Sequence, residues 1–260
     1  MRGVSASQKR MCTLTYLHAV VTGASSGIGA ATVRRLIAEG WEVTAVARRA
    51  DKLAALAKEV GCATFQADIT SDDDVAALVA ELTARGPVHA LVNNAGGAVG
   101  WDSIAASSLD QWTDQYAVNV VGTVRVTQAL LPALTESGHG DVVIVTSTAG
   151  HEPYENGAGY VAAKTAEVAM ARTLRLELTG TGVRVMEIAP GMVHTDEFSL
   201  NRFGGDQAKA DAVYQGIEPL MADDIADAIV WSLTRPHHVN IDQMVVRPRE
   251  QGGATKLVRR

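Results

Sequence analysis

The chain has 260 residues, of which 47% are hydrophobic and 20% are charged, and this composition suits one α/β domain with a full-sized core. The formal net charge of -6 argues against a nucleic acid or an anionic membrane as a partner, because phosphate groups are bound by clustered lysine and arginine. The only cysteines, Cys12 and Cys62, are far apart in the sequence and lack metal-ligand spacing. The sequence therefore excludes a disulfide framework, predicts no metal site and indicates the reducing cytoplasm.

The two ends of the chain are expected to be tails, residues 1–16 and residues 251–260, with short basic runs that are solvated. The apolar stretch 11–21 resembles a signal peptide, but polar residues interrupt it and a glycine loop follows directly. No stretch approaches the roughly 18 uninterrupted apolar residues of a membrane span. One domain is therefore expected over residues 17–250.

Short β-branched runs alternate with helical patterns along this domain. The apolar runs are continuous, which is typical of strands that are buried on both faces of a parallel sheet. Such a βαβ series predicts a Rossmann-type, doubly wound parallel α/β sheet with about seven strands and helices on both faces. Strands are expected at 18–21, 42–46, 63–65, 90–92, 142–145, 183–188 and 244–246. Helices are expected at 28–40, 52–60, 72–84, 109–136, 158–179 and 223–234.

A polar, glycine-bearing segment at about 192–220 interrupts the alternation. Long loops in compact domains usually cover a functional site. We therefore expect this segment, called the lid below, to be a loop over the site.

The first expected strand runs through TGASSGIG, residues 22–29, directly into a helix. Glycines permit a tight turn and close approach of a ligand, and the free N–H groups of the helix start favour a diphosphate. The spacing is G-x-x-x-G-x-G rather than the usual G-x-G-x-x-G. The pattern predicts a dinucleotide-binding turn, and the alternative is a purely structural turn. The expected contacts are Gly23, Ser25, Ser26, Gly27, Ile28 and Gly29.

The second expected strand ends in Arg48 and Arg49, with no acidic residue at the turn. In such folds an acid at this place binds the ribose of NAD, whereas arginine accommodates the 2′-phosphate of NADP. Cations before a helix N-terminus are unfavourable unless an anion joins them. The pair predicts NADP(H) as cofactor, and the alternative is two exposed surface arginines.

Polar residues also follow the third and fourth expected strands, at the edge where ligands of open α/β sheets bind. Asp68 could accept a hydrogen bond from the adenine amino group or cap a turn with Thr70. The sequence NNAG at 93–96 could contact the cofactor, or it could equally form an ordinary turn, because asparagine and glycine are common in turns. The expected cofactor contacts are Asp68, Ile69, Asn94, Ala95 and Gly96.

Tyr160 precedes Lys164 by one helical turn, so the two side chains share a face. An ammonium within about 4 to 6 Å of a phenol favours the phenolate, and this brings proton transfer near neutral pH within reach. The alternative is an amphipathic helix with a packed tyrosine and a solvated lysine.

The chain carries an ordered set of motifs within a match that runs from about residue 18 to 250. The motifs are TGASSGIG at 22–29, Asp68, NNAG at 93–96, Asn119, Ser147, YVAAK at 160–164 and Pro190-Gly191. In identity, order and spacing this set resembles the short-chain dehydrogenases/reductases. The resemblance implies an NADP-dependent enzyme that transfers hydride between the nicotinamide and a CH–OH group.

The resemblance also implies a role for each residue. Tyr160 would protonate the carbonyl oxygen during reduction and act as the base in the reverse direction, while Lys164 would support it and hold the nicotinamide ribose. Ser147 would bind the substrate oxygen. Asn119 would anchor a water that links Lys164 to solvent, or would simply be a buried amide that the backbone satisfies. Along the nicotinamide the resemblance places Pro190, Gly191, Val193 and Thr195.

The lid and the C-terminal third resemble a subgroup, the NADP-dependent 3-hydroxy acid dehydrogenases, which act on serine, allo-threonine and related acids and reduce malonic semialdehyde. The matching segments are 195–199, 202–203, 205–206, 209–210, 213–216 and 238–241. A substrate carboxylate then needs a cation, and Arg202 is the candidate. Alternatively, Arg202 pairs with Asp206 or Glu197 or supports a subunit contact. The expected substrate contacts are Ser147, His151, Tyr154, Met192, Phe198 and Arg202, with Glu152 and His194 nearby.

Two other functions stay open. A broad carbonyl reductase or a 3-oxoacyl thioester reductase would use the same four catalytic residues, although the acidic lid gives little sign of the basic patch that a carrier protein needs. A non-enzymatic NADP-sensing protein would have no need of Asn119, Ser147, Tyr160 and Lys164 together.

Two long helices, 109–136 and 155–179, resemble the pair that forms the dimer interface of this family. The resemblance implies a homotetramer built as a dimer of dimers. The other expected partner is a small-molecule substrate.

Overall fold

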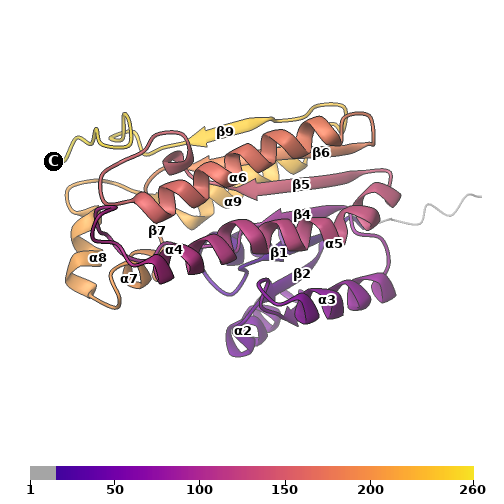
Figure 1. The fold of residues 1–260 in the computed structure, drawn as a ribbon. Helices are drawn as coiled ribbons and strands as arrows, with labels where there is room; N and C mark the ends of the chain where they lie inside the picture. The colour runs from indigo at the N-terminus through magenta and orange to yellow at the C-terminus, as the bar shows by residue number, and fades with distance from the viewer. Residues whose placement is uncertain (1–15) are drawn as a thin grey trace, which may run out of the picture.

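A seven-stranded parallel sheet forms the centre of the protein, in the order β3-β2-β1-β4-β5-β6-β9 (Figure 1). The computed structural model describes residues 16–260, so nearly all of the expected N-terminal tail lies outside the described residues. The strands are β1 His18–Thr22, β2 Glu42–Ala47, β3 Ala63–Gln66, β4 Ala90–Asn93, β5 Gly140–Val145, β6 Val183–Pro190 and β9 Gln243–Val246. Because β1, β4, β5 and β6 are buried along their whole lengths, their sequences are mostly apolar, and two of the charged exceptions, Asp141 and Arg184, pair with each other.

Helices cover both faces of the sheet. They are α1 Gly27–Ala38, α2 Ala50–Val60, α3 Asp72–Arg85, α4 Leu109–Tyr116, α5 Thr123–Glu136, α6 Ala158–Glu177 and α9 Ala222–Leu233. One core contains Leu36, Leu53 and Ile229 from α1, α2 and α9. The other contains Leu78 and Leu130 from α3 and α5, and α6 lies on the same face (Figure 1). The predicted doubly wound α/β fold is confirmed.

The strand order changes direction between β1 and β4, which are neighbours in the sheet. Open α/β sheets bind their ligands at such a switch point, outside the carboxyl ends of the strands. The glycine loop after β1 and the NNAG sequence after β4 therefore meet where a dinucleotide site is expected.

The helix expected at 109–136 is continuous, but its middle, η1 Ala117–Gly122, is π-helical. Such wider turns are frequent at functional sites, and Asn119 lies in this one. Within the described residues this is the one helix that length and composition would allow to cross a membrane. Here α5 packs against β4 and β5, as a core helix does.

The lid contains more regular structure than the expected loop. It comprises β7 Val193–His194, α7 Phe198–Arg202 and α8 Gln207–Tyr214, and β7 pairs with β8 Leu220–Met221. Asp206 caps α8 by accepting a hydrogen bond from the Lys209 N–H at 3.1 Å. The expectation of a loop was wrong, because these helices are short and polar and give little periodic signal.

The C-terminal residues contact the lid, although Lys256, Arg259 and Arg260 are exposed as expected for a solvated end. The Arg260 N–H donates to the Gly216 carbonyl at 2.8 Å. The Arg259 guanidinium donates to the carbonyls of Val213 and Gln215, at the end of α8. Helix ends leave carbonyls without intrahelical partners, and arginine satisfies them here. Figure 1 shows the chain end on the same side of the molecule as α8.

Candidate active site

The glycine loop, residues 22–29, packs against the end of β4 and is hydrogen-bonded to it. Gly23 has a φ of +64°, and a Cβ at this position would lie 2.8 Å from Ala95 Cα, so only glycine fits. The Asn94 side-chain amide donates to the Thr22 carbonyl at 3.0 Å. The Thr22 hydroxyl in turn accepts the N–H of Ala95 at 3.1 Å. The predicted contacts of these two motifs thus lie side by side at the switch point.

The lid approaches the glycine loop at its second glycine. A Cβ on Gly27 would lie 3.3 Å from Thr195 Cγ2. Thr195 follows β7, so the start of the lid lies against the start of α1. This places Thr195 beside the helix N-terminus where a diphosphate would bind.

Arg49 forms an anion-binding cluster with the hydroxyls of the glycine loop. Its guanidinium donates to Ser25 Oγ at 2.7 Å and to Ser26 Oγ at 2.9 Å. The same guanidinium pairs with Glu197 of the lid at 2.5 Å, and Glu197 also accepts from Ser26 at 2.8 Å. The hydrogen bond from Arg49 holds the pKa of the Glu197 carboxyl below its ordinary value. The Arg49 side chain is 40% exposed but paired, whereas Arg48 matches the alternative of an exposed surface arginine, and the contact of either with a phosphate stays a prediction.

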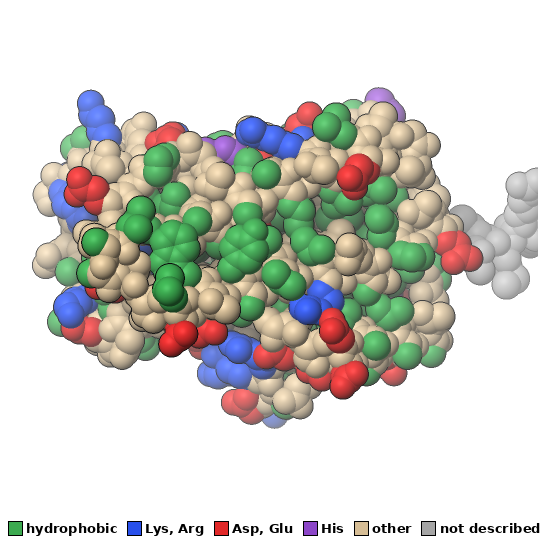
Figure 2. All heavy atoms as spheres, in the orientation of Figure 1, with side chains coloured by type: hydrophobic (Ala, Val, Ile, Leu, Met, Phe, Trp, Pro, Cys, Tyr) green, Lys and Arg blue, Asp and Glu red, His purple; other side chains and the backbone are tan. Residues whose placement is uncertain are grey.

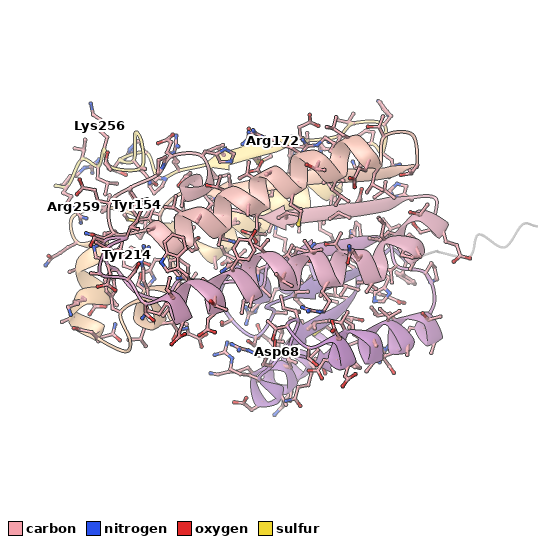
Figure 3. All side chains as sticks on the ribbon, viewed as in Figure 1. Asp68, Tyr154, Arg172, Tyr214, Lys256 and Arg259 are labelled. Atoms are coloured by element: carbon pink, nitrogen blue, oxygen red, sulfur yellow. The ribbon has the colours of Figure 1, made fainter. Side chains whose placement is uncertain are left out.

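Asp68 lies at the edge of the same region, beside α2 and α3 (Figure 3), and Arg48 is its neighbour. The Arg48 side chain is 73% exposed, 3.9 Å from Asp68 Oδ2. Asp68 Oδ1 accepts the N–H and the hydroxyl of Thr70 at 2.9 and 2.7 Å, so the turn alternative holds for this oxygen. Burial acts to raise the pKa of Asp68, but the bonds from Thr70 and the charge of Arg48 hold it below its usual value. The side chain of Ile69 is buried against Gly122.

Tyr160 and Lys164 lie on the buried face of α6, 8% and 5% exposed. Lys164 Nζ is 5.9 Å from the centroid of the Tyr160 ring and donates to the Val145 carbonyl at 3.0 Å. A Cβ on Gly96 would lie 3.5 Å from Lys164 Nζ, so the ammonium reaches the NNAG sequence. The alternative of a solvated lysine is wrong.

Ser147 follows β5 and begins the short helix η2 Thr148–Gly150. Its Oγ accepts the Ala149 N–H at 3.1 Å and donates to the Pro190 carbonyl at 3.4 Å. Two backbone contacts therefore fix this hydroxyl at the carboxyl ends of β5 and β6.

Asn119 joins η1 to the segment that follows β4. Its side-chain oxygen accepts the Gly97 N–H at 3.1 Å, and its amide donates to the Gly97 and Gln115 carbonyls at 3.0 and 2.7 Å. The backbone thus satisfies this buried amide, as one alternative stated. Its role in anchoring a water stays a prediction.

The lid helix α7 lies over Tyr160. The Phe198 ring meets the Tyr160 ring edge-on, with centroids 5.7 Å apart. The Arg202 guanidinium carbon lies 5.7 Å from the Tyr160 ring centroid and 4.3 Å from that of Trp101. Arg202 also donates to the Tyr154 hydroxyl at 2.9 Å, and Tyr154 stacks on Trp101. Figure 3 shows Tyr154 near the first turn of α6.

The two expected acidic partners of Arg202 lie elsewhere. Asp206 contacts Lys209, and Glu197 contacts Arg49. No carboxylate within residues 16–260 forms an ion pair with Arg202, and its buried Nε has no hydrogen-bond partner among them. The positive charge beside Tyr160 is therefore uncompensated in the described part of the chain.

Two predicted substrate contacts are held by other partners. The His151 ring contacts Glu187 Oε1 at 2.6 Å and the Gln243 amide at 2.9 Å, on β6 and β9. The Met192 N–H donates to the Gln251 side chain at 2.9 Å. The apolar cluster around Tyr160 contains neither residue, and their contact with substrate stays a prediction.

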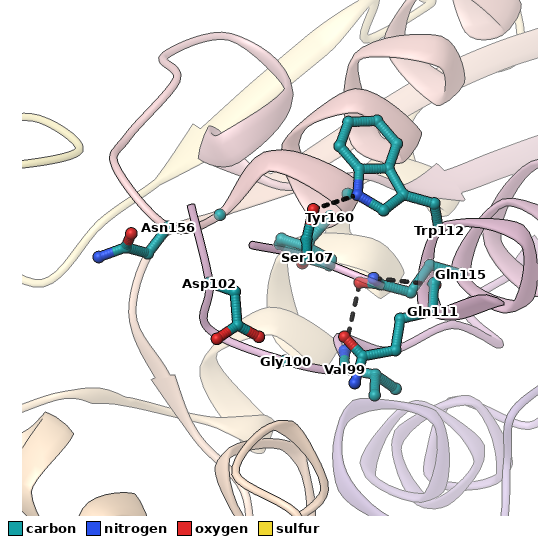
Figure 4. Close-up of a pocket in the computed structure, with 11 residues that line it drawn as sticks. Val99, Gly100, Asp102, Ser107, Gln111, Trp112, Gln115, Asn156 and Tyr160 are labelled. Atoms are coloured by element: carbon teal, nitrogen blue, oxygen red, sulfur yellow. Dashed lines mark hydrogen bonds between the residues drawn. The ribbon is translucent and has the colours of Figure 1, made fainter. Parts of the chain in front are cut away.

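A small cavity of about 20 Å³ lies behind Tyr160, between α4 and the start of α6 (Figure 4). Two hydrogen bonds border it, from Trp112 Nε1 to Ser107 Oγ at 2.9 Å and from the Val99 N–H to Gln115 Oε1 at 3.2 Å. A cavity of this volume admits about one water molecule. It is too small to bind a substrate.

Three contacts of the site were not predicted, namely those of Glu167 with Lys164, of Glu197 with Arg49 and of Trp101 with Arg202. Glu167 had a signal in the sequence, because it follows Lys164 by three residues on the same helix face. Glu197 lies in an acidic stretch that gives no sign of its contact with Arg49. Trp101 lies in a stretch without periodicity, and no pattern pointed to it.

Comparison with known proteins identifies the family. Residues 17–202 match the family model of the short chain dehydrogenases. An uncharacterized oxidoreductase of Mycobacterium tuberculosis is 56% identical over 238 residues, which cover 92% of this chain and 93% of that protein. Serine 3-dehydrogenase of Agrobacterium fabrum is 40% identical over 238 residues, covering 90% and 95%. The solved closed form of a serine dehydrogenase complexed with NADP+ superposes with a TM-score of 0.89 at 37% identity, covering 94% of this chain and 100% of that one.

The chain therefore belongs to the short-chain dehydrogenase family, and the resemblance stated from its motifs is confirmed. It is an NAD(P)-dependent oxidoreductase that acts on hydroxyl groups.

Proposed function

We propose that this oxidoreductase interconverts small 3-hydroxy acids, of the serine, allo-threonine or 3-hydroxypropionate type, with the corresponding 3-oxo acids, using NADP(H). One observation carries the proposal: the Arg202 guanidinium lies 5.7 Å from the Tyr160 ring and lacks a carboxylate partner within residues 16–260. A guanidinium fork matches a carboxylate in geometry and charge. A substrate whose hydroxyl meets Tyr160 can thus present its carboxylate to Arg202. The similarity to serine 3-dehydrogenase supports this substrate class.

The described residues divide the proposed chemistry between them. A bound nicotinamide would supply the hydride acceptor for oxidation and the hydride donor for reduction. The Tyr160 phenolate takes the proton of the substrate hydroxyl during oxidation, and the resulting Tyr160 hydroxyl returns a proton to the substrate oxygen during reduction. Ser147 keeps its Oγ in place by accepting the Ala149 N–H, and it donates to the same substrate oxygen by turning its one proton away from the Pro190 carbonyl. Phe198 packs edge-on against Tyr160 and excludes water from this side of the ring.

The residues around the glycine loop fit a dinucleotide that carries a 2′-phosphate. Gly23 leaves room for a close approach, since a Cβ would already meet Ala95. Arg49 and the loop hydroxyls bind the Glu197 carboxylate, an anion that stands in for a phosphate. Arg48 is exposed beside them. The NADP+ complex of the similar serine dehydrogenase supports the same cofactor.

Arg49→Ala is expected to raise the KM for NADPH about tenfold or more, because a hydrogen bond to a charged group contributes about 1.5 to 3 kcal/mol. The KM for NADH should change little, since NADH lacks the 2′-phosphate. Arg48→Ala should act in the same direction. Steady-state kinetics with both cofactors measures the effects, with Arg34→Ala on the exposed side of α1 as control. Equal changes for NADPH and NADH would remove the phosphate assignment.

Arg202→Leu is expected to lower kcat/KM for L-serine, L-allo-threonine and 3-hydroxypropionate by about 10²-fold, because a charge pair is lost from a partly buried site. The rate with a neutral ketone should change far less. Arg202→Lys should restore only part of the loss, since lysine lacks the fork. Arg172→Leu, on the outer face of α6, is the control (Figure 3).

Two results of this substrate panel would contradict the assignment. An equal loss for acids and neutral ketones would mean that Arg202 only holds α7 in place. A parent enzyme that prefers neutral ketones would favour the broad carbonyl reductase instead.

We also propose that the protein assembles as a homotetramer. Large apolar side chains are exposed along the helices expected at the interface, namely Leu109, Tyr116, Val121 and Leu176. Figure 2 shows hydrophobic side chains gathered on the face that α4, α5 and α6 form. Exposed apolar surface of this kind marks interaction sites.

A further inference from the structure

A buried carboxylate, Glu167, lies directly behind the catalytic pair. Tyr160, Lys164 and Glu167 follow one another at intervals of one turn and share the face of α6 that meets the sheet. Glu167 is 1% exposed, and its Oε2 lies 2.7 Å from Lys164 Nζ. Among the described residues this oxygen has no other polar partner. Its charge therefore acts on Lys164 without screening by water.

A second buried acid, Glu187 of β6, faces the same region. It is also 1% exposed, but it accepts the Thr146 hydroxyl at 2.8 Å and lies 2.6 Å from the His151 ring. The segments η1 and η2, which also pack on α6, contain no titratable side chain. The helix α4 meets α6 at Gly159, two turns before Glu167. Glu187 thus has partners of its own, whereas Glu167 depends on Lys164.

The two members of the Lys164–Glu167 pair respond differently to burial. Burial raises the pKa of Glu167 to about 7 against the opposing charge of Lys164, and Glu187 adds to the rise. Burial acts to lower the pKa of Lys164, but the charges of Glu167 and Tyr160 outweigh it and raise that pKa above its ordinary value. Near neutral pH the lysine stays cationic while Glu167 changes its charge.

We propose that Glu167 is a positioning residue that sets the net charge presented to Tyr160 through Lys164, and thereby the pH range in which the enzyme works. A charged Glu167 cancels part of the field of the ammonium and makes the phenolate of Tyr160 less favourable. A neutral Glu167 lets the full ammonium charge act on Tyr160. The inference rests on the proposed acid and base role of Tyr160, and it does not depend on which hydroxy acid is the substrate.

Glu167→Gln is expected to move both limbs of the pH profile of kcat/KM toward acid by about one pH unit, as for one charge in a partly shielded site. The reaction is oxidation of 3-hydroxypropionate by NADP+, because this substrate has no amino group that titrates. The acidic limb moves to the extent that it lies where Glu167 of the parent is charged, because removal of that charge leaves the ammonium uncompensated and favours the phenolate. The alkaline limb moves because a buried lysine without a counter-charge loses its proton more readily.

Two further variants keep the test interpretable. Glu167→Asp keeps the negative charge on a side chain that is shorter by one methylene. It should therefore fold at least as readily as Glu167→Gln. It should move both limbs of the pH profile in the same direction as Glu167→Gln, but by less. Glu177→Gln, exposed on the same helix, should leave the profile unchanged. A purely structural role would lower kcat at every pH, together with the melting temperature, and would leave both limbs in place. That result overturns the proposal.

A second measurement separates this inference from the proposed function. If the parent enzyme does not oxidise 3-hydroxypropionate, the substrate assignment fails, but the ionisation of Tyr160 can still be followed by tyrosinate absorbance. The signal of Tyr160 is the difference between titrations with and without Tyr160→Phe. It should appear at lower pH when Glu167→Gln is also present, and an unchanged titration contradicts the proposal.

Discussion

Tyr160→Phe is expected to lower kcat by about 10³-fold while NADPH binding stays nearly unchanged. The substitution removes only the hydroxyl, so the edge-on contact with Phe198 and the approach of Arg202 are kept. A positioned general acid or base contributes about 10² to 10⁴-fold to a rate, and Ser147 alone cannot move the proton to solvent. Single-turnover hydride transfer measures the loss, and NADPH fluorescence measures binding.

The matched control is Tyr16→Phe, which removes a hydroxyl from an exposed tyrosine just before β1, outside the helices expected at the interface. Its kcat should equal that of the parent. If Tyr160→Phe instead lost NADPH binding and kept its rate at saturation, Tyr160 would belong to the cofactor site alone. The acid and base role would then be withdrawn.

Asp141→Ala is expected to lower the free energy of unfolding by about 3 to 5 kcal/mol, because it leaves a buried arginine without its counter-charge. Arg184 is 5% exposed and contacts both Asp141 oxygens, at 2.6 and 2.8 Å. Its guanidinium also donates to the carbonyls of Leu233, Arg235 and Val239, beyond α9 and at its end. For a chain of this size the melting temperature should fall by roughly 10 °C.

Asp242→Ala is the control for this buried pair, because it removes the exposed partner of Arg175. Exposed pairs contribute about 0 to 1 kcal/mol, so its urea unfolding curve should nearly overlay that of the parent. Asp141 lies near the amino end of β5, away from the site at the carboxyl ends, so folded Asp141→Ala should keep its activity. A melting curve unchanged by Asp141→Ala would show that the pair contributes no net stability.

The sheet was predictable because its strands are buried on both faces. Val142 to Val145 and Val183 to Ile188 are apolar runs with few breaks, and the structure extends each by only two residues. The lid was not predictable in the same way. Residues 207–214 are too short and too polar to show a periodic face, and contacts with distant segments decide their structure.

In the candidate site, too, features set by local sequence were predictable and contacts between distant segments were not. Tyr160 and Lys164 could be paired from the sequence because one helix fixes their spacing. The contact of Arg49 with Glu197 joins residues 148 positions apart, and no local pattern encodes it. The stacking of Arg202 on Trp101 likewise requires the lid to fold back over the loop that follows β4.

Glu197 of the lid occupies the cluster formed by Arg49 and the loop hydroxyls, so it would compete with a phosphate that binds there. An anion that binds the Arg49 guanidinium must displace the Glu197 carboxylate. Its binding free energy is therefore reduced by the free energy of breaking the contacts of Glu197 with Arg49 and Ser26. Thermodynamic linkage makes the relation reciprocal, and the anion loosens the lid by the same factor by which the lid weakens the anion. The affinity of Arg49 for an anion is therefore coupled to the contact between the lid and the glycine loop.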